Sequence, residues 1–161
     1  MITTAHTLAT GSTYPTVWGL DPLQLHDRFW AARGVQVVRQ GEPSEIVADA
    51  ELFLLADPRT LTIFRLGELV DQMSWLEPDV VFVRLHDIRE RGYREVAGAD
   101  ARGNLTTFRR EYGGVDSRLA RVALTPMREL ARVWQNARDT RAGERLLRRS
   151  VRANHRTAAS V

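Results

Sequence analysis

The apolar run Leu52-Phe53-Leu54-Leu55-Ala56, which stops at Asp57, decides how this chain is expected to fold. It has the length of a strand and no polar alternation, which is typical of a strand covered on both faces of a sheet. Asp57-Pro58 ends it, because the residue before proline avoids helical dihedral angles and proline breaks a strand ladder. A second apolar run, Val80 to Val83, follows after a segment with helical spacing. We therefore expect two buried strands joined by a helical crossover.

The segments around these two strands extend the pattern. Asp21-Pro22 begins a helix, because Asp caps the first turn and Pro suits the first helical position, and Gly34 lies just past its end. Thr62 to Leu66 is either a strand or the entry to a helix over 67–75, and Ser44 to Asp49 is either a short strand or one helical turn. The other expected elements are strands at 35–39, 79–85 and 119–124, a hairpin about Asp100-Ala101-Arg102-Gly103, and helices from Thr125-Pro126 to about Ala137 and over 143–152. Strands interleaved with helices favour an α/β fold with a mixed sheet.

Length and composition set the broad class. At 161 residues, with 43% hydrophobic and 27% charged residues, the chain is expected to form one globular domain. We divide it into an extended arm over 1–19, a single α/β domain over 20–137, and an arginine-rich helix or tail over 138–161, with 155–161 expected to be disordered. No apolar run is long enough to span a bilayer, and Met1 to Thr13 has no features of a signal peptide. A cytoplasmic location is the default expectation, and without cysteine there is no disulfide or thiol nucleophile.

The charges are unevenly distributed along the chain. All 23 basic residues are arginine and lysine is absent, so any phosphate contact must come from Arg or from backbone amides. Residues 1–117 carry 12 arginines and 17 acids, a balance of −5, whereas residues 118–161 carry 11 arginines and 3 acids, a balance of +8. The sequence thus predicts an acidic body with a basic C-terminal segment.

Polar residues stand at the expected ends of the two buried strands, where open α/β sheets bind ligands. Asp57 follows the first strand, and Arg84, His86 and Asp87 end the second. A carboxylate at such an end can hold Mg²⁺, and His86 beside Asp87 is a candidate general base. Arg89 close behind is either an anion ligand or part of a solvated loop. Asp near turns usually terminates strands and caps them, and we favour that structural role for the aspartates and no catalytic role for His86.

The same block matches a family pattern in its order of motifs. The motifs are Leu54-Leu55-Ala56-Asp57, an apolar segment and helix over Leu61 to Trp75, the strand Val80 to Val83, Gly92-Tyr93, and Asp100-x-x-Gly103-x-Leu105-x-x-Phe108 followed by Glu111. Over about residues 52–111 this order resembles the central part of the sugar-nucleotide nucleotidyltransferases, the NDP-sugar pyrophosphorylase family.

The resemblance implies a nucleotidyltransferase-like partial sheet and a role in nucleotide-sugar or polysaccharide metabolism. It implies that Asp57 holds Mg²⁺, that Arg84 to Asp87 face a sugar phosphate, and that Tyr93 and Glu111 bind ligand. The chain lacks the family's N-terminal glycine-rich loop and its lysines. With these features missing, the resemblance implies that the chain is a catalytically impaired member of the family, a pseudoenzyme, or a member that needs a partner chain. An active one would be a Mg-dependent sugar-phosphate nucleotidyltransferase.

The basic C-terminal segment supports an alternative function. Its candidate anion-binding residues are Arg141, Arg145, Arg148, Arg149 and Arg152. They predict either phosphate contacts with nucleic acid, or an amphipathic helix that docks on an acidic protein or a membrane surface. If these arginines have no binding role, the segment is expected to be a solvated, frayed C-terminus. In the alternative, the chain is a non-enzymatic binding module without a cofactor.

Overall fold

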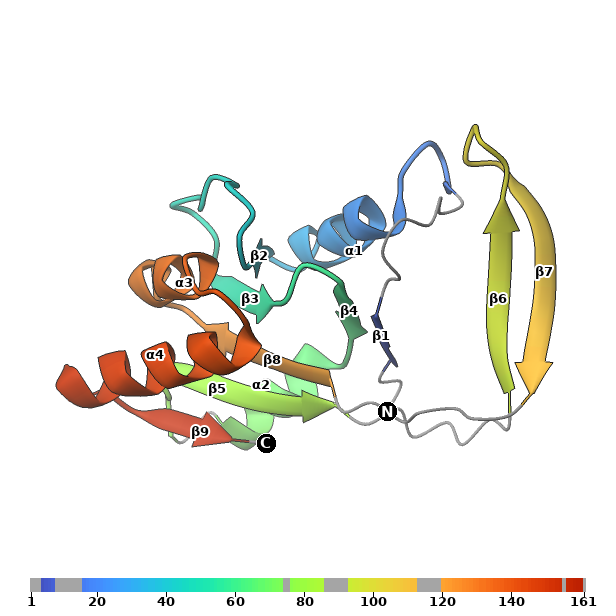
Figure 1. The fold of residues 1–161 in the computed structure, drawn as a ribbon. Helices are drawn as coiled ribbons and strands as arrows, with labels where there is room; N and C mark the ends of the chain where they lie inside the picture. Colours follow the sequence, from blue (N-terminus) through green and yellow to red (C-terminus); the bar gives the residue numbers. More distant parts are fainter. Residues whose placement is uncertain are drawn as a thin grey trace.

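The computed structural model describes residues 4–7, 16–73, 76–85, 93–112, 120–154 and 156–160. Strands and helices alternate along these residues, which confirms the expected α/β fold (Figure 1). The elements are β1 (Thr4–Thr7), α1 (Pro22–Ala31), β2 (Val35–Arg39), β3 (Leu52–Ala56), β4 (Thr60–Ile63), α2 (Leu66–Met73), β5 (Val80–Leu85), β6 (Tyr93–Ala99), β7 (Leu105–Tyr112), β8 (Ala120–Thr125), α3 (Arg128–Gln135), α4 (Thr140–Ala153) and β9 (Ala158–Ser160).

The main sheet is mixed and has the strand order β2-β3-β8-β5-β9. β2 pairs in parallel with β3, and β5 pairs in parallel with β9. β8 lies between β3 and β5 and is antiparallel to both. Consequently β2, β3, β5 and β9 all run in one direction, and their carboxyl ends meet at one edge of the sheet.

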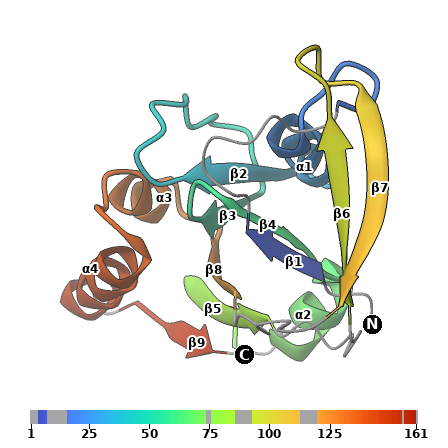
Figure 2. The same cartoon turned by 45° about the vertical axis from the view of Figure 1, so that its right-hand side comes forward.

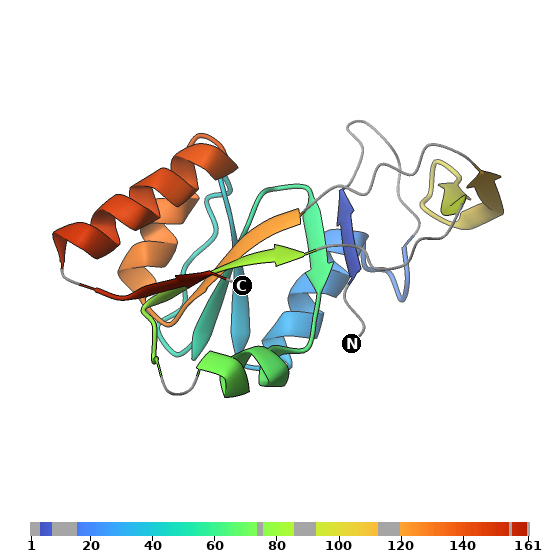
Figure 3. The same ribbon diagram turned by 90° about the horizontal axis from the view of Figure 1, so that it is seen from below.

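Helices cover both faces of this sheet (Figures 2 and 3). Leu54 and Leu55, adjacent in β3, point into different core clusters because side chains alternate along a strand. The cluster that contains Leu54 includes Trp30 of α1 and residues of α2, and the cluster that contains Leu55 includes Trp134 of α3 and Leu147 of α4. Trp30 and Trp134 are fully buried, which confirms the prediction that they pack in the core.

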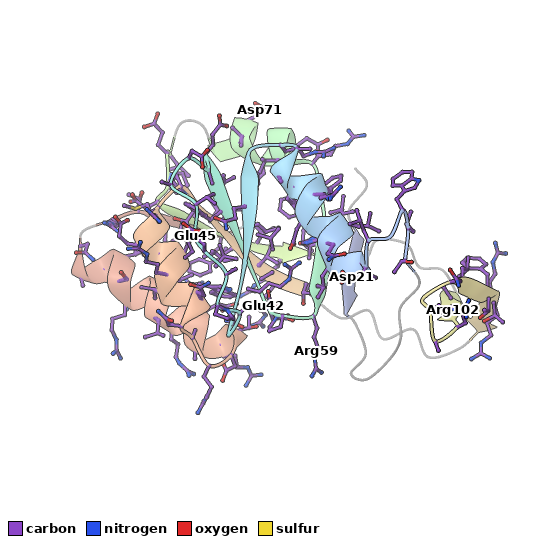
Figure 4. The ribbon with its side chains drawn as sticks, turned by 90° about the horizontal axis from the view of Figure 1, so that it is seen from above. Asp21, Glu42, Glu45, Arg59, Asp71 and Arg102 are labelled. Atoms are coloured by element: carbon purple, nitrogen blue, oxygen red, sulfur yellow. The ribbon has the colours of Figure 1, made fainter. Side chains whose placement is uncertain are left out.

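The start of α1 follows the predicted capping pattern. The Asp21 carboxylate, labelled in Figure 4, accepts the backbone N–H of Gln24 at 2.8 Å. In return the Asp21 backbone N–H donates to the Gln24 side chain at 3.1 Å. Pro22 occupies the first helical position, and Gly34 adopts φ +72° just past the helix end. Local residue chemistry alone therefore determines both ends of this helix.

β6 and β7 form the expected hairpin as a separate two-stranded sheet, to one side of the main sheet in Figures 1 and 3. The Asp100 carboxylate accepts the backbone N–H groups of Arg102 at 2.8 Å and Asn104 at 2.9 Å, and Gly103 takes φ +82°. Hydrogen bonds from the Asn104 side chain and backbone hold the pKa of Asp100 below its ordinary value.

The expectation that 155–161 are disordered is wrong for 158–160, which form β9 along β5. Asp79, just before β5, holds the segment in place. Its carboxylate accepts the Thr157 backbone N–H at 2.7 Å, and its own N–H donates to the Thr157 carbonyl at 3.1 Å. The anchor lies 78 residues away in sequence, so composition near the C-terminus gives no sign of it.

Two further segments differ from the expectations or settle their alternatives. The N-terminal arm contains β1, which pairs antiparallel with β4, so Thr60–Ile63 is a strand and not a helix entry. Residues 44–47 are neither strand nor helix. The Gln36 side chain of β2 holds them, donating to the Glu45 carbonyl at 2.7 Å and accepting the Val47 N–H at 3.0 Å. These side-chain bonds replace strand pairing along the outer edge of β2.

Candidate anion-binding site

Asp57 lies at the carboxyl edge of the main sheet, as the sequence predicts, and its carboxylate closes a turn. One oxygen accepts the backbone N–H of Arg59 at 2.8 Å, and the other accepts the hydroxyl of Thr60. Both oxygens therefore have donors from the turn that leads into β4. This geometry agrees with the strand-terminating role favoured from the sequence.

A metal ion at Asp57 stays a prediction. Within the described parts of the chain, no three His, Cys, Asp or Glu side chains come together in a way that could hold a metal ion. A lone carboxylate whose oxygens are both hydrogen-bonded does not fit Mg²⁺, which needs several oxygen ligands. No chemical step is assigned to Mg²⁺ here.

The other residues of the predicted catalytic site are not gathered around Asp57. Arg84 is exposed on β5, two strands away from β3 in the sheet. His86, Asp87 and Arg89 fall outside the described residues. Tyr93 and Glu111 belong to the hairpin sheet, where the backbone register sets them opposite Tyr112 and Arg94. Among the described residues, strand pairing brings none of them to the end of β3.

A buried polar network, which the sequence analysis missed, joins α1 to β2 and β4. Arg39 is 2% exposed, and its guanidinium donates to Asp27 at 2.6 Å and to Nδ1 of His26 at 3.0 Å. Nε2 of His26 lies 2.9 Å from the Thr62 carbonyl oxygen and 3.0 Å from the Thr62 backbone nitrogen. The Trp30 indole N–H donates to the same carbonyl at 2.9 Å. The network pairs the buried charge of Arg39 with Asp27, leaves Arg39 Nε without a hydrogen-bond partner, and connects α1 to the sheet.

The Asp27 carboxyl makes the stability that this network contributes depend on pH. Burial raises its pKa, but the neighbouring His26 side chain, 3.6 Å away, and the hydrogen bond and charge of the Arg39 guanidinium outweigh burial and hold the pKa below its ordinary value. A depressed native pKa stabilises the fold above the unfolded value of about 3.9, and this stabilisation is lost as pH falls through the native pKa. We expect Asp27→Asn to flatten the fall in unfolding free energy below about pH 4. Urea titrations at pH 3 to 6 measure it, and equal slopes in both proteins contradict the assignment.

The basic C-terminal segment forms a regular helix docked on the sheet. The buried residues of α4 are Gly143, Leu147 and Val151, which recur at a spacing of four and face the core. A Cβ at Gly143 would lie 2.7 Å from the Trp134 ring, so only glycine lets α4 approach α3 this closely. The prediction of a helix here is confirmed, and the helix begins at Thr140, earlier than the predicted 143.

The opposite side of α4 carries a row of arginines. Arg141, Arg145, Arg148 and Arg152 lie at positions i, i+4, i+7 and i+11, and all four are exposed. This spacing places them within one narrow stripe of a helix, which we call the arginine stripe. Arg149 is also exposed and lies beside the stripe. The structure thus gathers all five predicted anion-binding residues on the outer side of α4.

The arginine stripe opposes helix stability. Like charges three or four residues apart cost about 0.2–0.5 kcal/mol per pair in a helix. Among the described residues, no carboxylate forms an ion pair with any of the four stripe arginines. The one acid inside α4, Glu144, lies 3.9 Å from Arg121 of β8. The stripe is therefore a surface with an excess of positive charge, although Asp139 interacts electrostatically with Arg145.

Arg148 is positioned without using its hydrogen-bond donors. Its guanidinium carbon lies 4.1 Å from the centroid of the Phe82 ring, which belongs to β5 and is 5% exposed. Stacking on an aromatic face orients the guanidinium and leaves its N–H groups free at the edge. The aromatic contact with Phe82 therefore orients the Arg148 guanidinium.

Asp139 is the N-cap residue of α4, and its contribution to the stability of the fold can be measured. Its carboxylate accepts the Ala142 backbone N–H at 2.8 Å, and this bond, with one from Arg138, holds the pKa of Asp139 below its ordinary value. We expect Asp139→Ala to destabilise the fold by about 1 kcal/mol. Asp139→Asn keeps an acceptor and should recover most of this. Urea denaturation measures both, and an equal loss in the two variants contradicts the capping role.

Comparisons of this chain with protein-family models, with curated proteins and with solved structures gave no match. The fold and surface define an α/β protein with a mixed five-stranded sheet and an arginine-rich helix on one face. In the described part of the chain, no helix has the length and apolar character required to cross a membrane.

Proposed function

We propose that this chain is a nucleic-acid-binding module that contacts phosphates through the arginine stripe of α4. The observation that carries the proposal is the register of this helix: one side is docked by Gly143, Leu147 and Val151, and the side turned to solvent presents four arginines. A guanidinium donates two parallel hydrogen bonds to a phosphate, which is why Arg is favoured for phosphate recognition.

The length of the stripe suits a phosphate backbone. From Arg141 to Arg152 the helix advances about 16 Å at 1.5 Å per residue. Along duplex DNA each strand presents a phosphate about every 3.4 Å of axis, so the stripe spans roughly five phosphates of one strand. We assign the stripe to phosphate contacts, which carry no sequence information, and expect binding that does not depend on base sequence.

Fluorescence anisotropy with labelled duplexes tests the proposal. Two duplexes of equal length and unrelated sequence should bind with dissociation constants within about twofold of each other, as backbone contacts require. Polyglutamate of matched charge serves as the acidic-protein competitor and should bind more weakly, because carboxylates are not spaced as phosphates are. Tighter binding of polyglutamate than of duplex would assign the stripe to an acidic protein partner instead.

A second candidate function rests on the order of elements between β3 and β7. A buried strand ending in Asp57, a short strand with a helix, a second buried strand and a hairpin follow one another, which supports a nucleotidyltransferase-like scaffold. With Asp57 closing a turn, this scaffold would bind a nucleotide sugar without catalysis. Thermal shift with nucleoside triphosphates and NDP-sugars, with and without Mg²⁺, checks it. At a hundred times its dissociation constant a ligand adds about 2.7 kcal/mol, and no shift with any of them removes this candidate.

A further inference from the structure

Strand pairing places two arginines side by side near the carboxyl edge of the sheet. In the antiparallel register of β5 and β8, Arg84 stands directly opposite Arg121, and both are exposed. Directly opposite residues have Cβ atoms about 4.5–5.5 Å apart and share a face of the sheet. Phe82 and Ala123, two residues before and after them, belong to the core cluster beneath α4. Arg84 and Arg121 therefore stand on the face that carries α4.

Arg148 of α4 extends this pair to three cations. It stacks on the Phe82 ring, and Phe82 is two residues from Arg84 on the same face of β5. From the other side, Arg121 lies 3.9 Å from Glu144, one helical turn before Arg148. Arg84 and Arg121 are therefore neighbours through strand pairing, and α4 contacts both strands, through Glu144 on Arg121 and through Arg148 on Phe82. We call Arg84, Arg121 and Arg148 the arginine seat.

The seat lacks the counter-charge that three neighbouring cations call for. Like charges directly opposite on two strands are destabilising. Glu144, with its side chain 23% exposed, is the one carboxylate that forms an ion pair with the seat among the described residues, at nearly the limit of contact. A compact anion of two or more negative charges would neutralise the pair and accept hydrogen bonds from several guanidinium groups.

We propose that the arginine seat binds a phosphate or polyphosphate group, as found on a free nucleotide or at the end of a nucleic-acid strand. This site goes beyond the proposed nucleic-acid contact: it shares Arg148 with the arginine stripe, but Arg84 and Arg121 belong to the seat alone. The seat is built on two strands and a docked helix, so the backbone positions of its three arginines are set by the fold.

Titration calorimetry with tripolyphosphate in low-salt buffer tests the seat. Arg84→Gln and Arg121→Gln should each weaken binding about fivefold to tenfold, since each removes charge-assisted hydrogen bonds. Arg28→Gln is the control, because it removes the same charge from an exposed position of α1 outside both the seat and the stripe and should change affinity less than about twofold. Glu144→Gln should tighten binding by freeing Arg121, a gain that loss of structure does not produce. Thermal unfolding of each variant establishes that it is folded.

Two results would overturn the seat: no binding of tripolyphosphate by the unmodified protein, or an equal loss in Arg84→Gln and Arg28→Gln. The source of the phosphate is decided with ATP and with duplexes that carry or lack a 5′-phosphate. If Arg84→Gln weakens ATP and leaves the duplexes unchanged, the ligand is a free nucleotide. If it removes a preference for the phosphorylated duplex, the ligand is a strand end. Failure of the stripe is detected separately, through Arg145→Gln and Arg152→Gln with unphosphorylated duplex.

Discussion

Replacing Arg141, Arg145, Arg148 and Arg152 together by glutamine is expected to weaken duplex binding more than about 1,000-fold at ~50 mM salt, because the loss of four phosphate contacts removes the release of about four counterions. The four side chains are exposed, and the core contact that their replacement removes is the stacking of Arg148 on Phe82. The variant also loses the like-charge pairs of α4 and should unfold at an equal or higher temperature. Fluorescence anisotropy and thermal unfolding of the same preparation check both.

A control with the same change in net charge separates the stripe from general electrostatic attraction. Arg28, Arg59, Arg65 and Arg102 are exposed on other elements, and Figure 4 shows Arg59 and Arg102 projecting from turns away from α4. Replacing these four by glutamine should weaken binding less than about fivefold, since exposed charges more than a Debye length away are screened. Equal losses in the two variants would mean that net charge, and not the stripe, attracts the duplex.

Trp134→Ala is expected to cost about 3–5 kcal/mol of unfolding free energy, the largest stability loss among the changes considered. Trp134 is fully buried between α3, α4 and the sheet, and its ring closes against Gly143. Its indole N–H donates to the carbonyl of Ala56 at 2.9 Å, so truncation leaves a cavity and removes one of the hydrogen bonds to this carbonyl, which also accepts the Gln40 N–H at 3.4 Å. Urea denaturation measures the loss.

Two companion variants identify what Trp134 contributes. Trp134→Phe keeps most of the volume and loses the hydrogen bond, so it should cost less than the alanine variant, about 1–3 kcal/mol. Trp18→Ala is the control: Trp18 is 92% exposed, at φ +53° in the tight turn between Val17 and Leu20, and its loss should change stability by less than about 0.5 kcal/mol. A similar loss in Trp18→Ala and Trp134→Ala would contradict the assigned core.

Local signals predict the elements that local chemistry determines. The apolar runs of β3 and β5, the Asp21 cap and the Asp100 turn each satisfy their own geometry within a few residues, and each lies where the sequence predicts it. β9 is held by the hydrogen bond between Thr157 and Asp79, which are 78 residues apart. Local sequence patterns therefore do not predict it. Tertiary pairing decides such a short strand, and its own composition does not.

The same distinction holds for the candidate sites. The arginine stripe is visible in the sequence because i, i+4, i+7 and i+11 spacing is a property of one helix. Arg121 becomes a partner of Arg84 only through the antiparallel register of β5 and β8, which the sequence does not reveal. Arg39 was missed for a similar reason, since its partners His26 and Asp27 lie on α1. The sequence signal that could have prompted a search for these partners is an arginine, Arg39, that directly follows the apolar residues Val37 and Val38 at the end of a strand.

The salt dependence of duplex binding tests the central claim, that α4 binds a phosphate backbone, most directly. With four arginines on phosphates, the logarithm of the association constant should fall against the logarithm of salt concentration with a slope of about −3.6. Each single Arg→Gln change in the stripe should reduce that slope by about 0.9, and the fourfold variant should bring it near zero. A slope near zero for the unmodified protein, or an unchanged slope in the fourfold variant, would contradict the claim.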